Sequence, residues 1–131
     1  MGLKFISASQ FSVKLKATIH NSGKLGFTEA TAKQLDFKEN SAVKFAQDET
    51  DESVLYLANN VPLDDDAFRV CKAGRYFYIN TKLMFDSLGI DYKNKTVMFD
   101  MVRIKELDGE IYKLIKRENK RLKKDSKETE E

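Results

Sequence analysis

The two side chains best suited to nucleophilic or acid–base chemistry occur once each, as Cys71 and His20. A Cys–His or Ser–His–Asp arrangement needs its histidine within hydrogen-bond reach of the nucleophile. His20 lies in an alternating, strand-like run far in sequence from Cys71, and we interpret it as a polar residue beside a turn. A structural zinc site takes about four cysteine or histidine ligands, which two residues cannot supply. A single cysteine also excludes an intrachain disulfide, which fits a reducing cytoplasm.

Other catalytic patterns are missing from the sequence. Neither of the glycine-rich phosphate loops, GxGxxG or GxxxxGK[ST], occurs. Carboxylates are plentiful, but no two stand at a spacing recognisable for acid–base catalysis. We therefore predict no catalytic residues, no metal site and no cofactor, and a protein that is not an enzyme.

Positive side chains follow glycines at two predicted hairpin tips. Paired cations at two such tips could contact phosphates, and Arg75 could read guanine through a bidentate contact. The alternative is that these glycine–basic pairs are ordinary solvent-exposed turn residues with no role in binding. Tyr76 and Tyr78 could stack on the bases of a single strand, although strand alternation places at least one face of this segment in the core. The candidate nucleic-acid-binding residues are Lys24, Arg69, Lys72 and Arg75.

Charge is distributed unevenly along the 131-residue chain, whose net charge is +2 and whose pI is ≈ 8.5. Residues 67–118 carry eleven Lys or Arg against seven acidic residues, whereas residues 1–60 carry seven of each. Many DNA-binding domains are more basic, with a pI above about 9. The composition, with 41% hydrophobic and 34% charged residues, is that of an ordinary globular protein.

The chain contains a weak internal repeat. Each copy has a glycine followed by a basic residue, then a short helical segment that ends in a leucine-containing exit, then a strand. The matching segments are Gly23-Lys24, Leu35-Asp36-Phe37 and Val43-Lys44-Phe45 in the first copy, and Gly74-Arg75, Leu88-Gly89-Ile90 and Val97-Met98-Phe99 in the second.

Hydrophobic patterning predicts mainly strands. Apolar residues alternate from Phe11 to Ile19, which predicts a half-buried strand; a turn at Asn21–Gly23 and a return strand at Leu25–Phe27 then complete a hairpin. Thr28 and Asn80 are expected to cap short helices, and a left-handed Gly89 to end the second. The predicted shared core consists of Leu35, Phe37, Val43, Phe45, Leu88, Ile90, Val97 and Phe99.

These two copies resemble the swapped-hairpin element of the AbrB/SpoVT family, in which Gly-Arg, a strand, a short helix and Leu-Gly-Ile precede a second strand. Gly74-Arg75 and Leu88–Ile90 match that motif letter for letter. Two copies in one chain resemble the MraZ arrangement, in which each copy forms half of a pseudo-dimeric β-barrel. Over residues from about 11 to 116, the resemblance implies a mainly β fold of tandem halves with one short helix each.

The resemblance also implies a bacterial-type transcriptional regulator that binds DNA. The family's proline is replaced by Thr28 and Asn80, which both suit helix caps. The aspartate expected four residues before each basic residue is replaced by His20 and Cys71. These missing aspartates, with the neutral first copy, favour an alternative: a structural or protein-interaction module on the same fold that has lost DNA binding.

The expected organisation is a first repeat over 1–60, an acidic linker over 61–66, a second repeat over 67–118 and a charged tail over 119–131, the tail being disordered or a frayed helix. No apolar run approaches the ~20 residues of a membrane-spanning helix, and the N-terminus lacks the apolar core of a signal peptide. We expect a cytoplasmic protein without membrane contact. Candidate partners are double-stranded DNA, a second copy of the chain or another protein.

Overall fold

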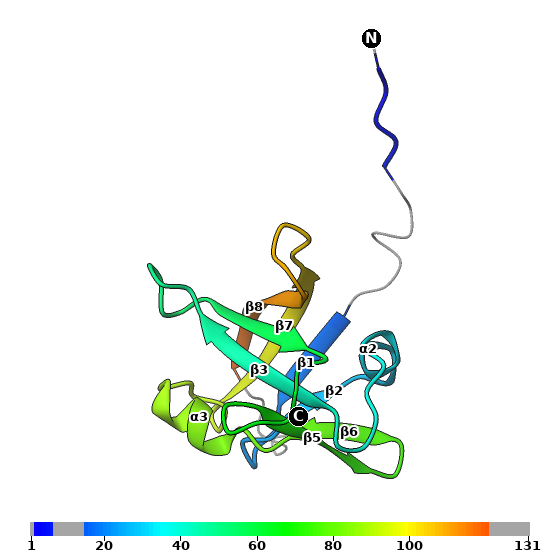
Figure 1. Cartoon of the computed structure of the whole chain (residues 1–131). Helices are drawn as coiled ribbons and strands as arrows, with labels where there is room; N and C mark the ends of the chain where they lie inside the picture. Colours follow the sequence, from blue (N-terminus) through cyan, green and yellow to red (C-terminus); the bar gives the residue numbers. More distant parts are fainter. Residues whose placement is uncertain (1, 7–14, 121–131) are drawn as a thin grey trace, which may run out of the picture.

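Eight antiparallel strands in the described part of the chain close into a barrel (Figure 1). The computed structural model describes residues 2–6 and 15–120. The order around the barrel is β1-β2-β6-β5-β3-β4-β8-β7, which confirms the predicted mainly β fold. The elements are β1 (Leu15–Ile19), β2 (Leu25–Phe27), α2 (Glu29–Gln34), β3 (Ala42–Gln47), β4 (Leu55–Asn59), β5 (Phe68–Ala73), β6 (Tyr76–Ile79), α3 (Lys82–Ser87), β7 (Lys95–Arg103) and β8 (Glu110–Lys120).

Half of the strand pairs join strands that are not consecutive in the chain. The hairpins are β1–β2, β3–β4, β5–β6 and β7–β8, and the remaining pairs are β1–β7, β2–β6, β3–β5 and β4–β8. In the β1–β7 pair, for example, Ile19 is opposite Val97 and Leu15 is opposite Met101. The barrel therefore depends on pairs between the early and late parts of the chain.

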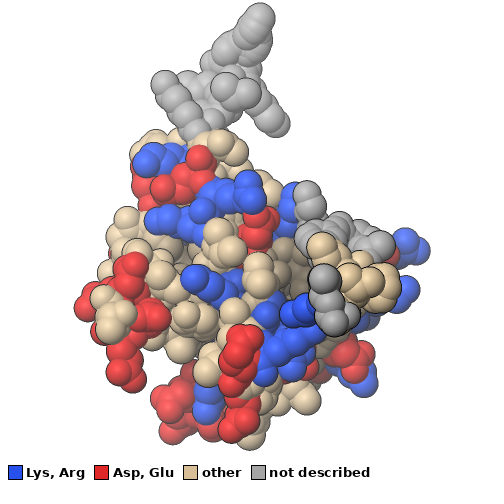
Figure 2. All heavy atoms as spheres, turned by 90° about the horizontal axis from the view of Figure 1, so that it is seen from above, with Lys and Arg blue, Asp and Glu red and all other residues tan. Residues whose placement is uncertain are grey.

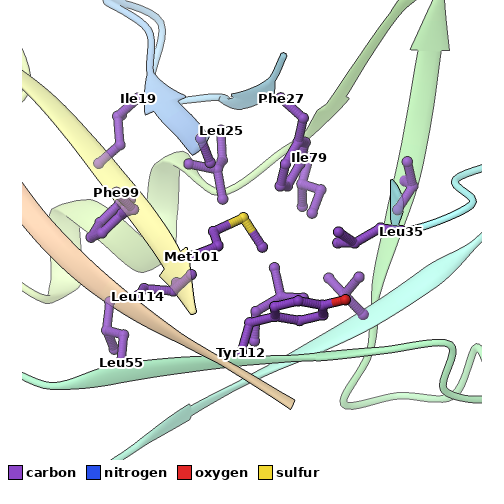
Figure 3. Close-up of a cluster of buried hydrophobic side chains, with 14 of the residues drawn as sticks. Ile19, Leu25, Phe27, Leu35, Leu55, Ile79, Phe99, Met101, Tyr112 and Leu114 are labelled. Carbon is purple, nitrogen blue, oxygen red and sulfur yellow. The ribbon is translucent and has the colours of Figure 1, made fainter. Parts of the chain in front are cut away.

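Alternating side chains fill the inside of the barrel, and Figure 3 shows several of them converging around Met101. On β7, Val97, Phe99 and Met101 are buried, whereas Met98 and Asp100 between them are partly exposed, as period-two alternation requires. The predicted core is confirmed: Leu35, Phe37, Val43, Val97 and Phe99 are buried, and Phe45, Leu88 and Ile90 pack against them.

Two short helices lie on different sides of the barrel (Figure 1). Thr28 caps α2 as predicted, because its hydroxyl oxygen accepts the Thr31 amide at 3.2 Å. The predicted cap of α3, Asn80, is wrong. Thr81 occupies the N-cap position, and its hydroxyl donates to the Gly23 carbonyl at 2.9 Å instead of capping the helix. This bond ties the start of α3 to the turn between β1 and β2.

Left-handed backbone follows each helix. Gly89 has φ +73° after α3, as predicted, and Asp36 has φ +56° after α2. The other non-glycine residues with positive φ in the described chain are Asn40 and Asn60. Asp and Asn tolerate this conformation better than other side chains do.

Strand β8 continues further than expected, to Lys120, which is opposite Lys95 of β7. The prediction of a tail from residue 119 is therefore wrong for its first two residues. Backbone hydrogen bonds to β7 order them although their side chains are polar. Residues 121–131 of that predicted tail, and residues 11–14 of the predicted first strand, lie outside the described residues. Over the described ranges, no helix is both long and apolar enough to cross a membrane.

Candidate nucleic-acid interface

Four neighbouring strands, β1, β2, β6 and β5, contain no Asp or Glu in their described residues. We call their outer surface, which carries Lys16, Lys24, Arg69, Tyr76 and Tyr78, the basic face. Charge is uneven elsewhere on the molecule too. On the surface seen in Figure 2, basic side chains gather near the middle, and acidic side chains lie mostly along the left and lower margins. Because the strands of the basic face carry cations and no carboxylates, this face can attract a polyanion without repulsion from neighbouring acidic side chains.

Lys24 is positioned by the turn that joins β1 to β2. The His20 amide donates to the Lys24 carbonyl at 2.9 Å, and the Gly23 amide donates to the His20 carbonyl at 2.8 Å. Gly23 has φ +87°, and a Cβ there would lie 2.7 Å from the Cβ of Lys82, so both backbone and packing require glycine. The Lys24 ammonium lies 4.6 Å from the centroid of the Tyr78 ring, a cation–π contact that holds it over β6.

Two tyrosines form an aromatic surface on β6. The rings of Tyr76 and Tyr78 are stacked, with centroids 6.0 Å apart and an interplanar angle of 21°. The Tyr76 hydroxyl is hydrogen-bonded to Nε2 of His20. This contact requires Gly26, because a Cβ at that position would overlap both groups. Partial burial raises the pKa of the Tyr76 hydroxyl.

Arg69 extends the basic face across β5. Ile79 of β6 is opposite Leu25 of β2 and Val70 of β5. One residue further along the antiparallel strands, Lys24, Asn80 and Arg69 therefore lie in one row across β2, β6 and β5. Adjacent strands are about 4.8 Å apart, so the Cα atoms of the two cations lie about 10 Å apart. Two cations at this spacing can contact separate phosphates of one duplex.

Lys72 and Arg75 lie apart from this row. Side chains three residues apart on a strand face opposite sides, so Lys72 lies on the other side of β5 from Arg69. Its ammonium is 5.8 Å from the centroid of the Phe77 ring. Arg75 is in the turn between β5 and β6, at the opposite end of the antiparallel β2–β6 pair from Lys24. The two hairpin tips are therefore about 17 Å apart along the strands.

Cys71 and His20 do not form a catalytic pair. Cys71 lies on β5 and His20 follows β1, with β6 and β2 between them, which separates the two by roughly 14 Å. The imidazole contacts Tyr76, and the thiol contacts the Asn80 amide at 3.8 Å. The interpretation of His20 as a polar residue beside a turn is confirmed, and its side chain is exposed. Among residues 2–6 and 15–120, no group of three or more His, Cys, Asp or Glu could hold a metal ion.

Sequence reasoning missed the contact between His20 and Tyr76. It predicted correctly that one face of the aromatic segment is turned to the core, since Phe77 packs against the core cluster. The sequence did not predict that Tyr76 and Tyr78 would both face outward, or that His20 of the first copy would contact Tyr76. One signal was available: Gly26 interrupts a predicted strand, and a glycine there often marks the close approach of another group.

Comparisons of this chain with protein-family models, with curated proteins and with solved structures find no match. Inferences about function therefore depend on the chemistry of the basic face. It combines two cations in a row with a pair of stacked rings, one exposed and one half-buried, and these groups bind phosphates and planar bases.

Proposed function

We propose that this chain is a transcriptional regulator that binds double-stranded DNA through the basic face, without catalysis. The observation that carries the proposal is the row of Lys24 and Arg69 on four strands that lack acidic residues. Cations in such a row contact phosphates and position a protein on a duplex. Arg75, exposed at the far tip, has the planar fork of donors that suits guanine in the major groove.

The strand pairing supports a barrel of two swapped-hairpin halves with one short helix each. The element order β1-β2-α2-β3-β4 is repeated as β5-β6-α3-β7-β8. Exchanging the two runs leaves the set of strand pairs unchanged, because β1 pairs with β7 just as β5 pairs with β3. This is the arrangement implied by the resemblance to the AbrB/SpoVT and MraZ proteins, and it adds weight to DNA binding as the function.

A second candidate is a protein-interaction module on the same fold. Val102 on β7 and Ile115 on β8 are 46% and 43% exposed, on strands that are direct neighbours. Exposed apolar side chains on adjoining strands suit a protein partner better than a polyanion.

Fluorescence anisotropy with a labelled random-sequence duplex separates the two functions. We expect the full chain to bind, with log affinity falling linearly as log salt concentration rises. The double variant Lys24→Ala/Arg69→Ala should reduce that slope by about 2, because two phosphate contacts are lost. The matched control Lys38→Ala/Lys105→Ala removes the same charge outside the basic face and should leave the slope nearly unchanged. No binding at low salt would contradict the proposal and favour the interaction module.

A further inference from the structure

A polar cavity of ≈ 350 Å³ lies where β4 ends and β8 begins. Its walls include Asn59, Glu110 and the loop residues Asp36, Asn40 and Asn60, and no residue of the basic face. A volume of this size falls within the usual range for small-molecule sites. All three non-glycine residues with positive φ in the described chain, Asp36, Asn40 and Asn60, border it, so unusual backbone turns shape its rim.

The inner wall is built from two residues that are direct partners across β4 and β8, Asn59 and Glu110. Asn59 is only 5% exposed. Its Nδ2 donates to Oε2 of Glu110 at 2.7 Å and to the Leu35 carbonyl at 2.8 Å. The Tyr112 hydroxyl donates to the same Oε2 at 3.0 Å. Among the described residues, no donor reaches Oδ1 of Asn59 or Oε1 of Glu110, so two acceptors on this wall are left free.

No Lys or Arg of the described ranges forms an ion pair with Glu110, and both of its donors are neutral groups. The guanidinium of Arg103, on the neighbouring strand β7, donates to the Gly109 carbonyl at 3.3 Å and lies 5.7 Å from the centroid of the Tyr112 ring, so it is near Glu110 without pairing with it. The cavity of Asn59 and Glu110 has no Lys or Arg in its lining. A second cavity, of ≈ 300 Å³, is bordered by a cation, Lys116, which pairs with Glu118 at 4.0 Å. A partly covered carboxylate that forms no ion pair is unfavourable, so the first cavity suits a positively charged occupant.

We propose that the cavity of Asn59 and Glu110 binds a guanidinium group. The geometry offers two unused acceptors on adjacent partner residues, one of them charged, and hydrogen bonds already fix both side chains. A guanidinium presents parallel donors in a rigid plane and matches paired acceptors better than an ammonium does. Asp36, which pairs with Lys38 at 3.8 Å, adds a second carboxylate at the rim. The described chain offers no third acidic, His or Cys ligand here for a metal ion.

Isothermal titration of the full chain with butylguanidinium, butylammonium and the neutral isostere butylurea tests this proposal. We expect saturable binding of butylguanidinium, weaker binding of butylammonium and none of butylurea. The side-chain amide signal of Asn59 in the ¹⁵N–¹H spectrum should shift with the same affinity. Butylurea binding as tightly as butylguanidinium, or no shift of the Asn59 signal, would overturn the proposal.

Glu110→Gln is the decisive variant. Glutamine still offers an acceptor to Asn59 and Tyr112 but has no charge, so we expect a loss of affinity of about tenfold or more. Asp65→Asn removes the same charge from the exposed linker and should bind as the wild type does. Should Glu110→Gln fail to fold, Asp36→Asn, at an exposed rim position, should still weaken binding. Unchanged affinity in a folded Glu110→Gln protein would refute the guanidinium site.

The guanidinium could be a free metabolite or the arginine side chain of another protein. Titration with the capped tripeptide Gly-Arg-Gly distinguishes the two sources. Binding as tight as that of butylguanidinium assigns the site to arginine side chains, and binding of butylguanidinium alone assigns it to small cations. Since no residue of the basic face borders the cavity, the outcome does not depend on whether the chain binds DNA.

Discussion

His20, which follows β1, is hydrogen-bonded to Tyr76 on β6 although strand β2 lies between them. Their rings meet edge to face, with centroids 5.5 Å apart. The contact passes over Gly26 of β2, whose missing side chain leaves room for both groups. One glycine therefore allows a residue from the first copy of the repeat to orient a tyrosine of the second copy on the basic face.

Gly26→Ala should break this contact and leave the fold almost as stable as in the wild type. The new Cβ would overlap the Tyr76 hydroxyl and the His20 ring, and both are side-chain ends on an outer surface that can move away. We therefore expect the free energy of unfolding to change by less than about 1 kcal/mol. Urea denaturation and the imidazole NMR signals of His20 measure the two effects. Unchanged imidazole signals would contradict the proposed role of Gly26.

Gly23→Ala should destabilise the fold more than Gly74→Ala does. Both glycines have positive φ, +87° and +64°, and so share the backbone cost of about 1–2 kcal/mol for a left-handed alanine. Only at Gly23 would the Cβ also meet the Cβ and Cα of Lys82, at 2.7 and 2.9 Å, whereas Gly74 faces open space. The additional crowding should cost about 1–3 kcal/mol. Equal losses in urea denaturation would show that the turn simply moves away from α3.

Phe99→Ala should cost about 3–5 kcal/mol of unfolding free energy, because it removes a large buried ring. Phe99 is 1% exposed and stacks on Phe85, with ring centroids 6.1 Å apart. Leu83→Ala on α3, at 83% exposure, is the control and should stay within about 0.5 kcal/mol of wild type. Guanidinium chloride denaturation checks both. A loss below about 1 kcal/mol for Phe99→Ala would contradict the inward register of β7.

Arg69→Ala should weaken DNA binding more than Lys72→Ala does. The two residues lie on one strand and carry the same charge, but they face opposite sides of β5. Arg69→Ala should lower the salt dependence by about one phosphate contact. Lys72→Ala should change it little, since that side chain lies on the other side of β5 from the basic face. If both variants weaken DNA binding equally in anisotropy titrations, binding depends on the net charge of the protein and not on the basic face.

The stabilising effect of Asp86 should disappear in acid. Hydrogen bonds from Lys82, at 2.7 Å, and from the Tyr92 hydroxyl, at 2.5 Å, hold the pKa of Asp86 below its ordinary value. A carboxyl with a lowered folded-state pKa stabilises the fold above its unfolded pKa, about 3.9, and loses that effect as the pH falls through the folded-state pKa. The difference in stability between wild type and Asp86→Asn should therefore be constant near neutral pH and shrink below about pH 4. Urea denaturation across this range measures it, and a difference independent of pH would contradict the assignment.

Local rules were enough to predict most of the strands, the start of α2 and the end of α3 from the sequence. Burial of one side of a strand imposes a period of two, which marks Ala17 and Ile19 on β1 and Val97 and Phe99 on β7 as core residues. The turn after α3 requires left-handed backbone, which Gly89 adopts at low cost. The same rules failed at Asn80, because the hydroxyl of Thr81 is bonded to the carbonyl of Gly23, a residue distant in the sequence.

Only the tertiary structure decided which strands lie side by side and which face each side chain occupies. A period of two shows that Tyr76 and Tyr78 share a face, but not that this face is the outer one or that β2 is the neighbour of β6. Closure of the barrel decides both, because each strand must pair on two sides and the register between distant strands follows from those pairs. This is why Lys24 and Arg69 lie in one row while Arg75 does not. It is also why Asn59 meets Glu110, 51 residues further along the chain.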